Sequence, residues 1–320
     1  MSIHEEGTIV VGKSDGSDTR SCAFDKVFGP TASQADVFEE LSLLVQSALE
    51  GYNVCVFAYG QTGSGKTYTM KGECGLQTEG VIPRTVRHIY KKIEELGILG
   101  WEYRIEASFL EIYNEHIVDL LEPKKHETHE IRMVDKKGQD LYVSNLHIAK
   151  INSQEELHEC LRTAQRNRAV AATQSNERPS RYHSVASIRL IGTHATKQEV
   201  SGNLNLVDLA GSETLKTNVI SPYKEVKETK NINKSLAYLD YVILAILKKR
   251  EHIPYRNSKL THLLMPSLGS NSKTLMLLNV SPLDECYKAT LNSLRFASNV
   301  NNCTTGSTKK SPRKNLDVPK

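Results

Sequence analysis

The chain has 320 residues, of which 39% are hydrophobic, and its formal net charge is +4. A chain of this length can bury a sizeable core without disulfides or a structural metal, and its six scattered cysteines include no Cys-x-x-Cys pair, so we expect reduced thiols. No apolar run approaches the roughly 20 residues that span a bilayer, and the modest charge indicates no particular partner, so we expect a soluble protein that binds neither membrane nor nucleic acid.

The first predicted elements are a helix and a buried strand. Apolar residues between positions 37 and 48 recur on one helical face, and Gly51 ends that helix. The apolar run at positions 54–58 follows directly and predicts a buried strand. This strand leads into a glycine-rich segment, which is the setting expected for a phosphate-binding loop.

Residues 60–67 form a complete Gly-x-x-x-x-Gly-Lys-Thr motif. Its glycines let consecutive backbone N–H groups turn toward phosphates, Lys66 can bridge the outer phosphate oxygens, and Thr67 can offer its hydroxyl to Mg²⁺. A chance match is the alternative, and the strand ahead of the motif argues against it. The motif therefore predicts a nucleotide triphosphate site made of Gly60, Gln61, Thr62, Gly63, Ser64, Gly65, Lys66 and Thr67.

Strands and helices alternate along the rest of the chain. A strand is predicted at 105–109, and Ser153 with Glu156 forms a capping box that opens a helix to about residue 168. Further strands are predicted at 185–191, 204–208 and 275–280, with a helix at 228–245. This alternation predicts an α/β fold with helices on both faces of the sheet and the nucleotide at the carboxyl edge of its strands.

One segment able to sense the third phosphate follows the predicted strand at 204–208. Asp208 can hold a Mg²⁺-bound water, and Gly211, three residues on, has a free N–H for the γ-phosphate. A guanine-specific enzyme would also carry Asn-Lys-x-Asp, but the Asn-Lys at 233–234 continues as Ser-Leu. Guanine specificity is therefore unsupported.

A second such segment lies at 176–183, ahead of another predicted strand. It brings a hydroxyl, a guanidinium and an imidazole together in Ser180, Arg181 and His183. Taken alone, the segment could equally be a solvated polar loop.

Together these segments resemble the kinesin motor family, which reads Asn-x-x-Ser-Ser-Arg-Ser-His and then Asp-Leu-Ala-Gly-Ser-Glu after the same phosphate loop. The resemblance covers roughly residues 5–303 and includes the stretches 57–70, 109–115, 231–236 and 252–261. Within the family, residues 256–269 and 293–303 are most similar to the C-terminal-motor, minus-end-directed, Ncd-like branch.

The resemblance implies a P-loop NTPase three-layer sandwich, with a central mixed sheet and helices on both faces. The motor domain would occupy residues 1–303, and the basic segment at 304–320 is expected to be a disordered tail. The family's first strand, which ends in Arg-x-Arg-Pro beside the adenine, has no counterpart before Ile9. We therefore expect a missing first strand and an exposed edge on its neighbour.

The resemblance also implies roles for individual residues. ATP and Mg²⁺ are the expected ligands, with Thr67, Ser180 and Asp208 at the metal and Tyr68 against the adenine. Arg181 is expected to close an ion pair onto Glu213 when ATP is bound, while Gly211 contacts the γ-phosphate. The expected catalytic residues are Lys66, Ser180, Arg181, Gly211 and Glu213.

The implied partner is the acidic microtubule. A charge run is by default a solvated face, but the stretch 252–261 matches a family motif, and its expected microtubule-binding residues are His252, Tyr255, Arg256 and Lys259. The helix at 228–245 would relay the loss of the γ-phosphate to this surface. We expect a cytoplasmic protein on the microtubule cytoskeleton, including the spindle, that is a monomer unless a coiled coil lies outside this chain.

Three departures from the family pattern bear on activity. Pro179 stands where the family has its first switch serine, and proline removes an N–H and fixes φ. Tyr182 replaces a third serine with a bulky ring. Tyr241, after Asp240, stands where the family carries Asn or Asp, so coupling between track and nucleotide is expected to differ.

Three functions remain open at this point. The leading one is a microtubule-stimulated ATPase with minus-end-directed movement by resemblance. The second is a microtubule-binding module with weak or uncoupled turnover, suggested by the departures and the missing strand. The third is a phosphate-loop enzyme acting on a small molecule, for which the chain carries no substrate motif.

Overall fold

The computed structural model describes residues 1–4, 7–13, 18–73, 75–123, 127–134, 140–174, 179–196, 198–213, 223–269 and 272–303. The predicted tail at 304–320 lies outside these ranges, as do residues 176–178. Within the described ranges, no helix combines the length and the apolar character that crossing a membrane requires.

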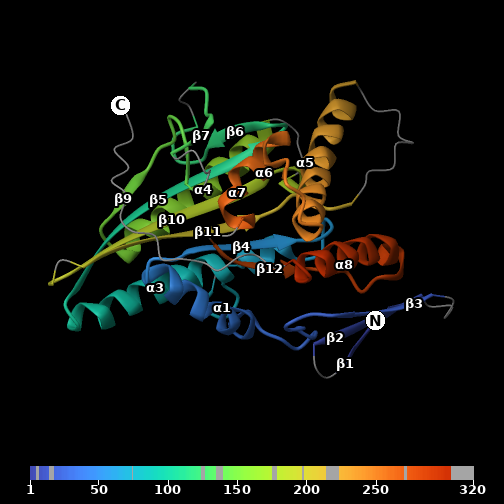
Figure 1. Cartoon of the computed structure of the whole chain (residues 1–320), viewed down its shortest axis with the longest axis horizontal. Coiled ribbons are helices and arrows are strands. Elements are labelled where there is room, and N and C mark those ends of the chain that lie inside the picture. The colour runs from blue at the N-terminus through green and yellow to red at the C-terminus, as the bar shows by residue number, and fades with distance from the viewer. Residues whose placement is uncertain are drawn as a thin grey trace.

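The centre of the molecule is a mixed β-sheet, as the family resemblance implies (Figure 1). Its strands in spatial order are β12 (Lys273–Leu278), β4 (Asn53–Tyr59), β11 (Glu199–Asp208), β10 (His183–His194), β5 (Trp101–Tyr113) and β6 (His116–Asp119), and β9 (Ala149–Ile151) also pairs with β5. β4 runs parallel to β11 and β12, and the other neighbours are antiparallel. Each predicted strand is present.

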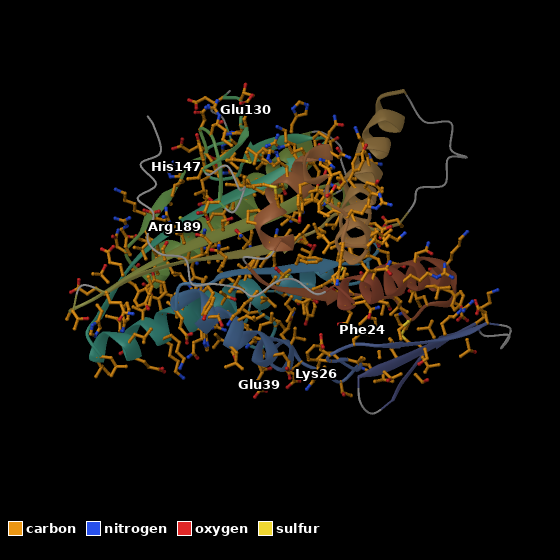
Figure 2. All side chains as sticks on the ribbon, viewed as in Figure 1. Phe24, Lys26, Glu39, Glu130, His147 and Arg189 are labelled. Atoms are coloured by element: carbon orange, nitrogen blue, oxygen red, sulfur yellow. The ribbon has the colours of Figure 1, made fainter. Side chains whose placement is uncertain are left out.

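Helices cover both faces of the sheet, which confirms the predicted three-layer arrangement (Figure 1). One face carries α1 (Gln34–Leu49), α3 (Val81–Ile98) and α4 (Gln154–Gln174), and the other carries α5 (Tyr223–Leu247), α6 (Lys259–Leu263), α7 (Met265–Leu268) and α8 (Tyr287–Asn301). All seven residues of β4 are buried, and alternate side chains enter the two cores. Side chains fill the space on both sides of the sheet (Figure 2).

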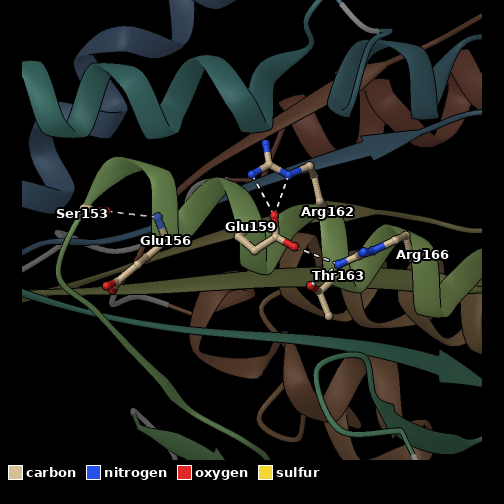
Figure 3. A network of polar contacts seen from close by, with 6 residues as sticks. All are labelled: Ser153, Glu156, Glu159, Arg162, Thr163 and Arg166. Carbon is tan, nitrogen blue, oxygen red and sulfur yellow. Dashed lines mark hydrogen bonds and ion pairs between the residues drawn. The ribbon is translucent and has the colours of Figure 1, made fainter.

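The helix termini follow the predicted signals. Gly51, just past α1, has a left-handed φ of 96°. At the start of α4, Ser153 Oγ accepts a hydrogen bond from Glu156 N at 3.2 Å, as predicted (Figure 3). The Glu156 carboxylate caps the backbone N of Asn152 instead, at 2.7 Å. Helix α4 ends at Gln174, beyond the predicted end near residue 168.

The outer face of α4 carries a short network of charges. The Glu159 carboxylate forms ion pairs with Nη2 of Arg162 and Nη2 of Arg166, each at 2.8 Å (Figure 3). The hydrogen bond from Arg162 lowers the pKa of Glu159. Residues three apart on a helix face each other, so the Glu159–Arg162 pair supports the helix that also carries Arg168.

Shorter elements connect the main ones. Helix α2 (Lys66–Met70) follows β4 after the loop at 60–65, and β7 (Ile131–Met133) pairs with β8 (Leu141–Val143). Single 3-10 turns occur at Pro179–Arg181, Tyr255–Asn257 and Asp284–Cys286.

The N-terminal strands form a separate antiparallel sheet. They are β1 (Ser2–His4), β2 (Thr8–Gly12) and β3 (Thr19–Ala23). Ile9 and Val11 of β2 pack with Leu294 of α8, so this small sheet lies beside the main one without joining it. In the part of the chain that the structure describes, β12 pairs with β4 alone, which agrees with the expected exposed edge.

This edge predicts a pattern of amide hydrogen exchange. Every residue of β12 is half-buried, and alternate N–H groups point away from β4, so about half of its amides should exchange at least about tenfold faster than the amides of β4. Exchange read by mass spectrometry or NMR on the intact chain tests this, with β4 as the internal reference. Uniform protection along β12 would mean that something covers the edge.

Candidate functional site

The turn between β4 and α2 has the backbone geometry of a phosphate-binding loop. Gly60, Gly63 and Gly65 have φ values of 150°, 79° and 99°, a region that favours glycine. A Cβ on Gly60 would lie 2.0 Å from the carbonyl oxygen of Asn279, whereas a Cβ on Gly63 would meet nothing within 4 Å. Gly60 therefore permits close packing, and Gly63 leaves the loop backbone open to an approaching group.

The side chain of Lys66 lies inside this loop. It is buried, and its Nζ donates to the carbonyl oxygen of Gln61 at 2.8 Å. Ser64 Oγ donates to the same carbonyl at 2.8 Å. Burial lowers the pKa of Lys66, while the carboxylates of Asp208 and Glu213 act in the opposite direction. The ammonium group is thus held among acceptors at the base of the loop.

Two of the predicted metal-binding residues meet beside the loop. Thr67 Oγ1 donates to Asp208 Oδ2 at 2.8 Å. The other carboxylate oxygen of Asp208 is buried and has no hydrogen-bond partner in the described part of the chain. A buried acceptor of this kind suits a metal-bound water, so the pair fits Mg²⁺. The described residues hold no cluster of three or more His, Cys, Asp or Glu that could bind a metal, and Mg²⁺ commonly relies on few protein ligands plus phosphate oxygens.

Asp208 belongs to a buried network of charged side chains that also includes Arg168, Glu111 and Lys71. Arg168 of α4 places its Nε 2.5 Å from Glu111 Oε1 and its Nη1 3.6 Å from Asp208 Oδ2. Burial raises the pKa of Glu111, and the charges of Arg168 and Lys71 oppose that rise. Burial, followed by the charge of Arg168, lowers the pKa of Lys71 to about 8. The Arg168 guanidinium therefore lies between two buried carboxylates, closer to Glu111 than to Asp208.

The two predicted phosphate-sensing segments are hydrogen-bonded to each other, and the one at 208–213 is also hydrogen-bonded to the loop. Gly211 N donates to the carbonyl oxygen of Ser180 at 2.8 Å, and Ser212 N donates to that of Gly60 at 3.0 Å. Ser180 thus joins the site through its backbone here. The segment at 208–213 bridges the loop and the segment at 179–183.

The carboxylate of Glu213 contacts the phosphate loop in this structure. The backbone N of Thr62 donates to Glu213 Oε2 at 2.7 Å, and Thr62 Oγ1 donates to Oε1. Among the described residues no ion pair joins Glu213 to Arg181, and Arg181 has other contacts. The pairing of Arg181 with Glu213 therefore stays a prediction for the ATP-bound arrangement.

His183 connects both segments to helix α5. The ring is 2% exposed, and its Nδ1 accepts from Ala210 N at 3.1 Å. The other ring nitrogen lies 2.8 Å from Ser235 Oγ on α5. Burial, assisted by the charge of Lys66, lowers the pKa of His183 to about 3, so the ring is neutral and Nε2–H donates to the serine.

The departures in the first segment are accommodated by the fold. Pro179 begins a 3-10 turn that ends at Arg181. The ring of Tyr182 is 7% exposed and stacks on Tyr113 of β5, with centroids 4.4 Å apart and an interplanar angle of 20°. The bulky ring is therefore packed inside the protein instead of crowding the loop.

The third departure lies on the surface of α5. Tyr241 is 43% exposed, and its hydroxyl accepts from Arg250 Nη1 at 2.9 Å. The Arg250 guanidinium also lies 5.5 Å from the centre of the Tyr241 ring, within cation–π range. Burial raises the pKa of the neighbouring Asp240.

The residues predicted to contact the adenine and the microtubule lie on α2 and in the stretch 252–261. Tyr68, on α2, is 48% exposed. His252 and Arg256 are exposed, and Tyr255 and Lys259 are half-buried around a short 3-10 turn and the start of α6. The backbone N of Lys259 donates to the carboxylate of Glu115, in the turn between β5 and β6, at 2.8 Å.

Sequence reasoning missed the buried network and the bridging histidine. Glu111 sits between apolar neighbours in a buried strand, and such a position signals a paired charge. His183 was visible as a titratable group, but its link to Ser235 depends on the packing of α5. A third omission is Cys286, whose sulfur accepts a hydrogen bond from Gln61 Nε2 at 2.9 Å.

The fold and the loop define a phosphate-loop nucleotide-binding protein in which the segment at 208–213 joins the loop to the segment at 179–183. Comparison with known proteins is more specific, because the sequence model of the kinesin motor domain matches residues 3–303. The chain is 53% identical to protein claret segregational of Drosophila melanogaster over 306 residues, which is 94% of this chain and 43% of that protein. It is 52% identical to carboxy-terminal kinesin 2 of Xenopus laevis over 288 residues, which is 88% of this chain and 45% of that protein.

A solved structure agrees with these relatives. The motor domain of the kinesin-like protein Kar3 of Saccharomyces cerevisiae superposes with a TM-score of 0.79 at 46% identity, over 92% of this chain and 88% of that one. The chain therefore belongs to the kinesin motor domain family, and its similarity to C-terminal kinesins confirms the predicted branch. It spans less than half the length of the curated relatives it matches.

Proposed function

We propose that this chain is an ATP-hydrolysing motor head that acts on microtubules. The observation that carries the proposal is the hydrogen-bonded unit formed by the phosphate loop and the segments at 179–183 and 208–213. Ser212 N reaches the carbonyl of Gly60, and Gly211 N reaches that of Ser180, at 3.0 and 2.8 Å. A group bound in the loop would therefore act on both segments at once.

The proposed chemistry uses positioning and charge. Lys66 and the backbone N–H groups of residues 60–67 would hold the phosphates of ATP, with Tyr68 beside the adenine. The N–H of Gly211 would then donate its hydrogen bond to the γ-phosphate in place of the carbonyl oxygen of Ser180. Arg181 would then pair with Glu213, which would leave Thr62, and this closure would exclude water other than the nucleophile.

Mg²⁺ is the proposed cofactor. Thr67, Ser180 and Asp208 would hold it, and the buried, unpartnered oxygen of Asp208 supports this assignment. When bound, the ion supplies positive charge that offsets the phosphate oxygens. Arg168 would help to orient the Asp208 carboxylate, because its Nη1 lies 3.6 Å from Oδ2 and leaves Oδ1 without a partner among the described residues.

The proposed partner surface is the stretch 252–261. Exposed Arg256 and half-buried Lys259 give this stretch positive charge that suits the acidic microtubule, and the proposed contacts are His252, Tyr255, Arg256 and Lys259. Movement toward the minus end, a place on the cytoskeleton that includes the spindle, and dimerisation through a coiled coil outside this chain are proposed by similarity to the C-terminal kinesins.

Steady-state phosphate release at saturating ATP, with and without microtubules, tests the proposal. We expect microtubules to stimulate turnover at least about tenfold and Lys66→Ala to abolish it, because this variant removes the charge that holds the outer phosphates. Exposed Lys248 on the chain offers a matched control, Lys248→Ala, that removes a lysine outside the loop. Phosphate release no higher than in Lys66→Ala, under both conditions, would refute the proposal.

A second candidate is a microtubule-binding module with weak or uncoupled turnover. It is favoured by the edge of β12, which has no strand partner other than β4 among the described residues. Asn279, just after this strand, packs directly against Gly60, so a loosely held β12 would disturb the phosphate loop. Co-sedimentation with microtubules separates the two functions. Binding that is the same with a non-hydrolysable ATP analogue and with ADP would favour the second candidate, and a strong nucleotide response would exclude it.

A further inference from the structure

We infer that Tyr182 is a positioning residue that couples the stretch 252–261 to the phosphate-sensing segment at 179–183, an inference that rests on the proposed function. Tyr182 lies immediately before β10, and in the β10–β5 register His183 is opposite Ile112. The ring of Tyr182 therefore meets that of Tyr113, the residue after Ile112 in β5. A serine at this position, as the family pattern has, could not form this contact.

The first step of the coupling is the aromatic stack. Tyr182 is almost fully buried, and its ring lies nearly parallel to that of Tyr113 with centroids 4.4 Å apart. Offset-stacked rings at this distance attract each other beyond their buried area. A displacement of the end of β5 would thus be carried to Tyr182, which adjoins Arg181.

The second step is a stiff turn at the end of β5. Asn114 and Glu115 both have left-handed φ values, 50° and 63°, and join Tyr113 to the paired residue His116 of β6. A two-residue turn of this kind has little freedom to absorb motion. The position of Glu115 therefore fixes that of the Tyr113 ring.

The third step reaches the proposed track surface. Glu115 Oε2 accepts a hydrogen bond from the backbone N of Lys259 at 2.8 Å, and the β5–β6 turn lies beside α6 (Figure 1). A charged acceptor makes this contact stronger than a neutral one. A partner that shifts the stretch 252–261 would move Glu115, and with it Tyr113 and Tyr182.

The opposite end of this route is the phosphate site. Ser180, two residues before Tyr182, accepts the hydrogen bond from Gly211 N at 2.8 Å. A movement of Tyr182 would change that bond and so the availability of the Gly211 N–H. This route is separate from the one through α5, because it passes through the end of β5 and enters the site from the segment at 179–183.

A double-mutant cycle tests the inference on the whole chain. Tyr182→Ser and Tyr113→Leu each remove the stack, and both together remove nothing further. We expect each single variant to lower the ratio of microtubule-stimulated to basal phosphate release by about two- to tenfold, the range that an aromatic pair allows, and the double variant to match the singles. Tyr182→Phe keeps the ring and should behave like the parent chain.

Trp101→Leu is a matched control for lost packing, since Trp101 stacks on Tyr103 at the far end of β5 with centroids 6.1 Å apart. It should lower the unfolding temperature without lowering the stimulation ratio. The inference is overturned if the ratio in Tyr182→Ser equals the parent's, if Tyr182→Phe fails as Tyr182→Ser does, or if the single effects add in the double variant. If microtubules do not stimulate phosphate release by the parent chain, the proposed function is refuted together with this inference. That result is obtained before any variant is compared, so the two failures can be told apart.

Discussion

A Glu213→Ala chain should lose microtubule-stimulated turnover by about 10²- to 10³-fold and still bind nucleotide, as should Arg181→Ala. Removal of one preorganised charged contact from a closed site costs about this much in rate. Neither side chain belongs to the cradle formed by Lys66 and the loop backbone, so binding should survive. Steady-state turnover and titration with a fluorescent ATP analogue measure the two quantities separately.

The structure sharpens this test. Glu213 accepts two hydrogen bonds from Thr62, so Glu213→Ala frees the donors of Thr62 while Arg181→Ala leaves them occupied. The exchanged pair, Arg181→Glu with Glu213→Arg, should recover part of the turnover if closure depends on their ion pair. Lost nucleotide binding in Glu213→Ala would instead assign Glu213 to the shape of the loop, and no recovery in the exchanged pair would count against the ion pair.

Replacing His183 with alanine should lower the free energy of unfolding by about 2 to 4 kcal/mol near neutral pH. The change leaves the buried N–H of Ala210 without its acceptor and opens a cavity beside Ser235. Chemical denaturation at about pH 7.5 measures it, with His252→Ala as the matched control because His252 is exposed. A loss no larger than in the control would contradict the bridging role of the ring.

The same residue makes stability depend on pH in a defined direction. The pKa of His183 is about 3 in the folded chain and about 6.5 when unfolded, so protons bind the unfolded chain preferentially. The stability associated with the neutral ring is complete above about pH 6.5 and falls as pH drops toward 3, by up to about 1.4 kcal/mol per pH unit. The difference in free energy of unfolding between the parent and His183→Ala should therefore become smaller from about pH 7.5 to about pH 5. A difference that does not change with pH would exclude the titration of His183 as a cause of pH-dependent stability.

The elements of the fold could be predicted because their signals are local. The buried run of β4, the glycines at 60–65 and the capping serine Ser153 each act on neighbours in sequence, and the structure contains all three features. The grouping of Thr67 with Asp208 could be expected from strand topology, since Asp208 ends β11 and Thr67 follows β4, and these two strands are adjacent and parallel.

Contacts between distant side chains could not be predicted in the same way. The sequence marks Tyr182 as a bulky replacement but contains no sign that Tyr113 receives its ring. Similarly, Glu213 has a proposed partner in Arg181, yet in this structure it contacts Thr62. Such choices depend on which loop conformation places two groups within reach, and local propensity carries no information about that.

The place of β4 in the sheet has a consequence for how the protein forms. Its two hydrogen-bonded neighbours, β11 and β12, begin at Glu199 and Lys273, late in the chain. Contacts between residues so far apart in sequence slow folding, because a long loop must close before they form. The strand that anchors the phosphate loop can therefore complete both of its ladders only when nearly the whole domain has left the ribosome. A chain shortened before β12 should leave β4 with β11 as its single parallel neighbour, and Gly60 of the loop without the Asn279 backbone against which it packs.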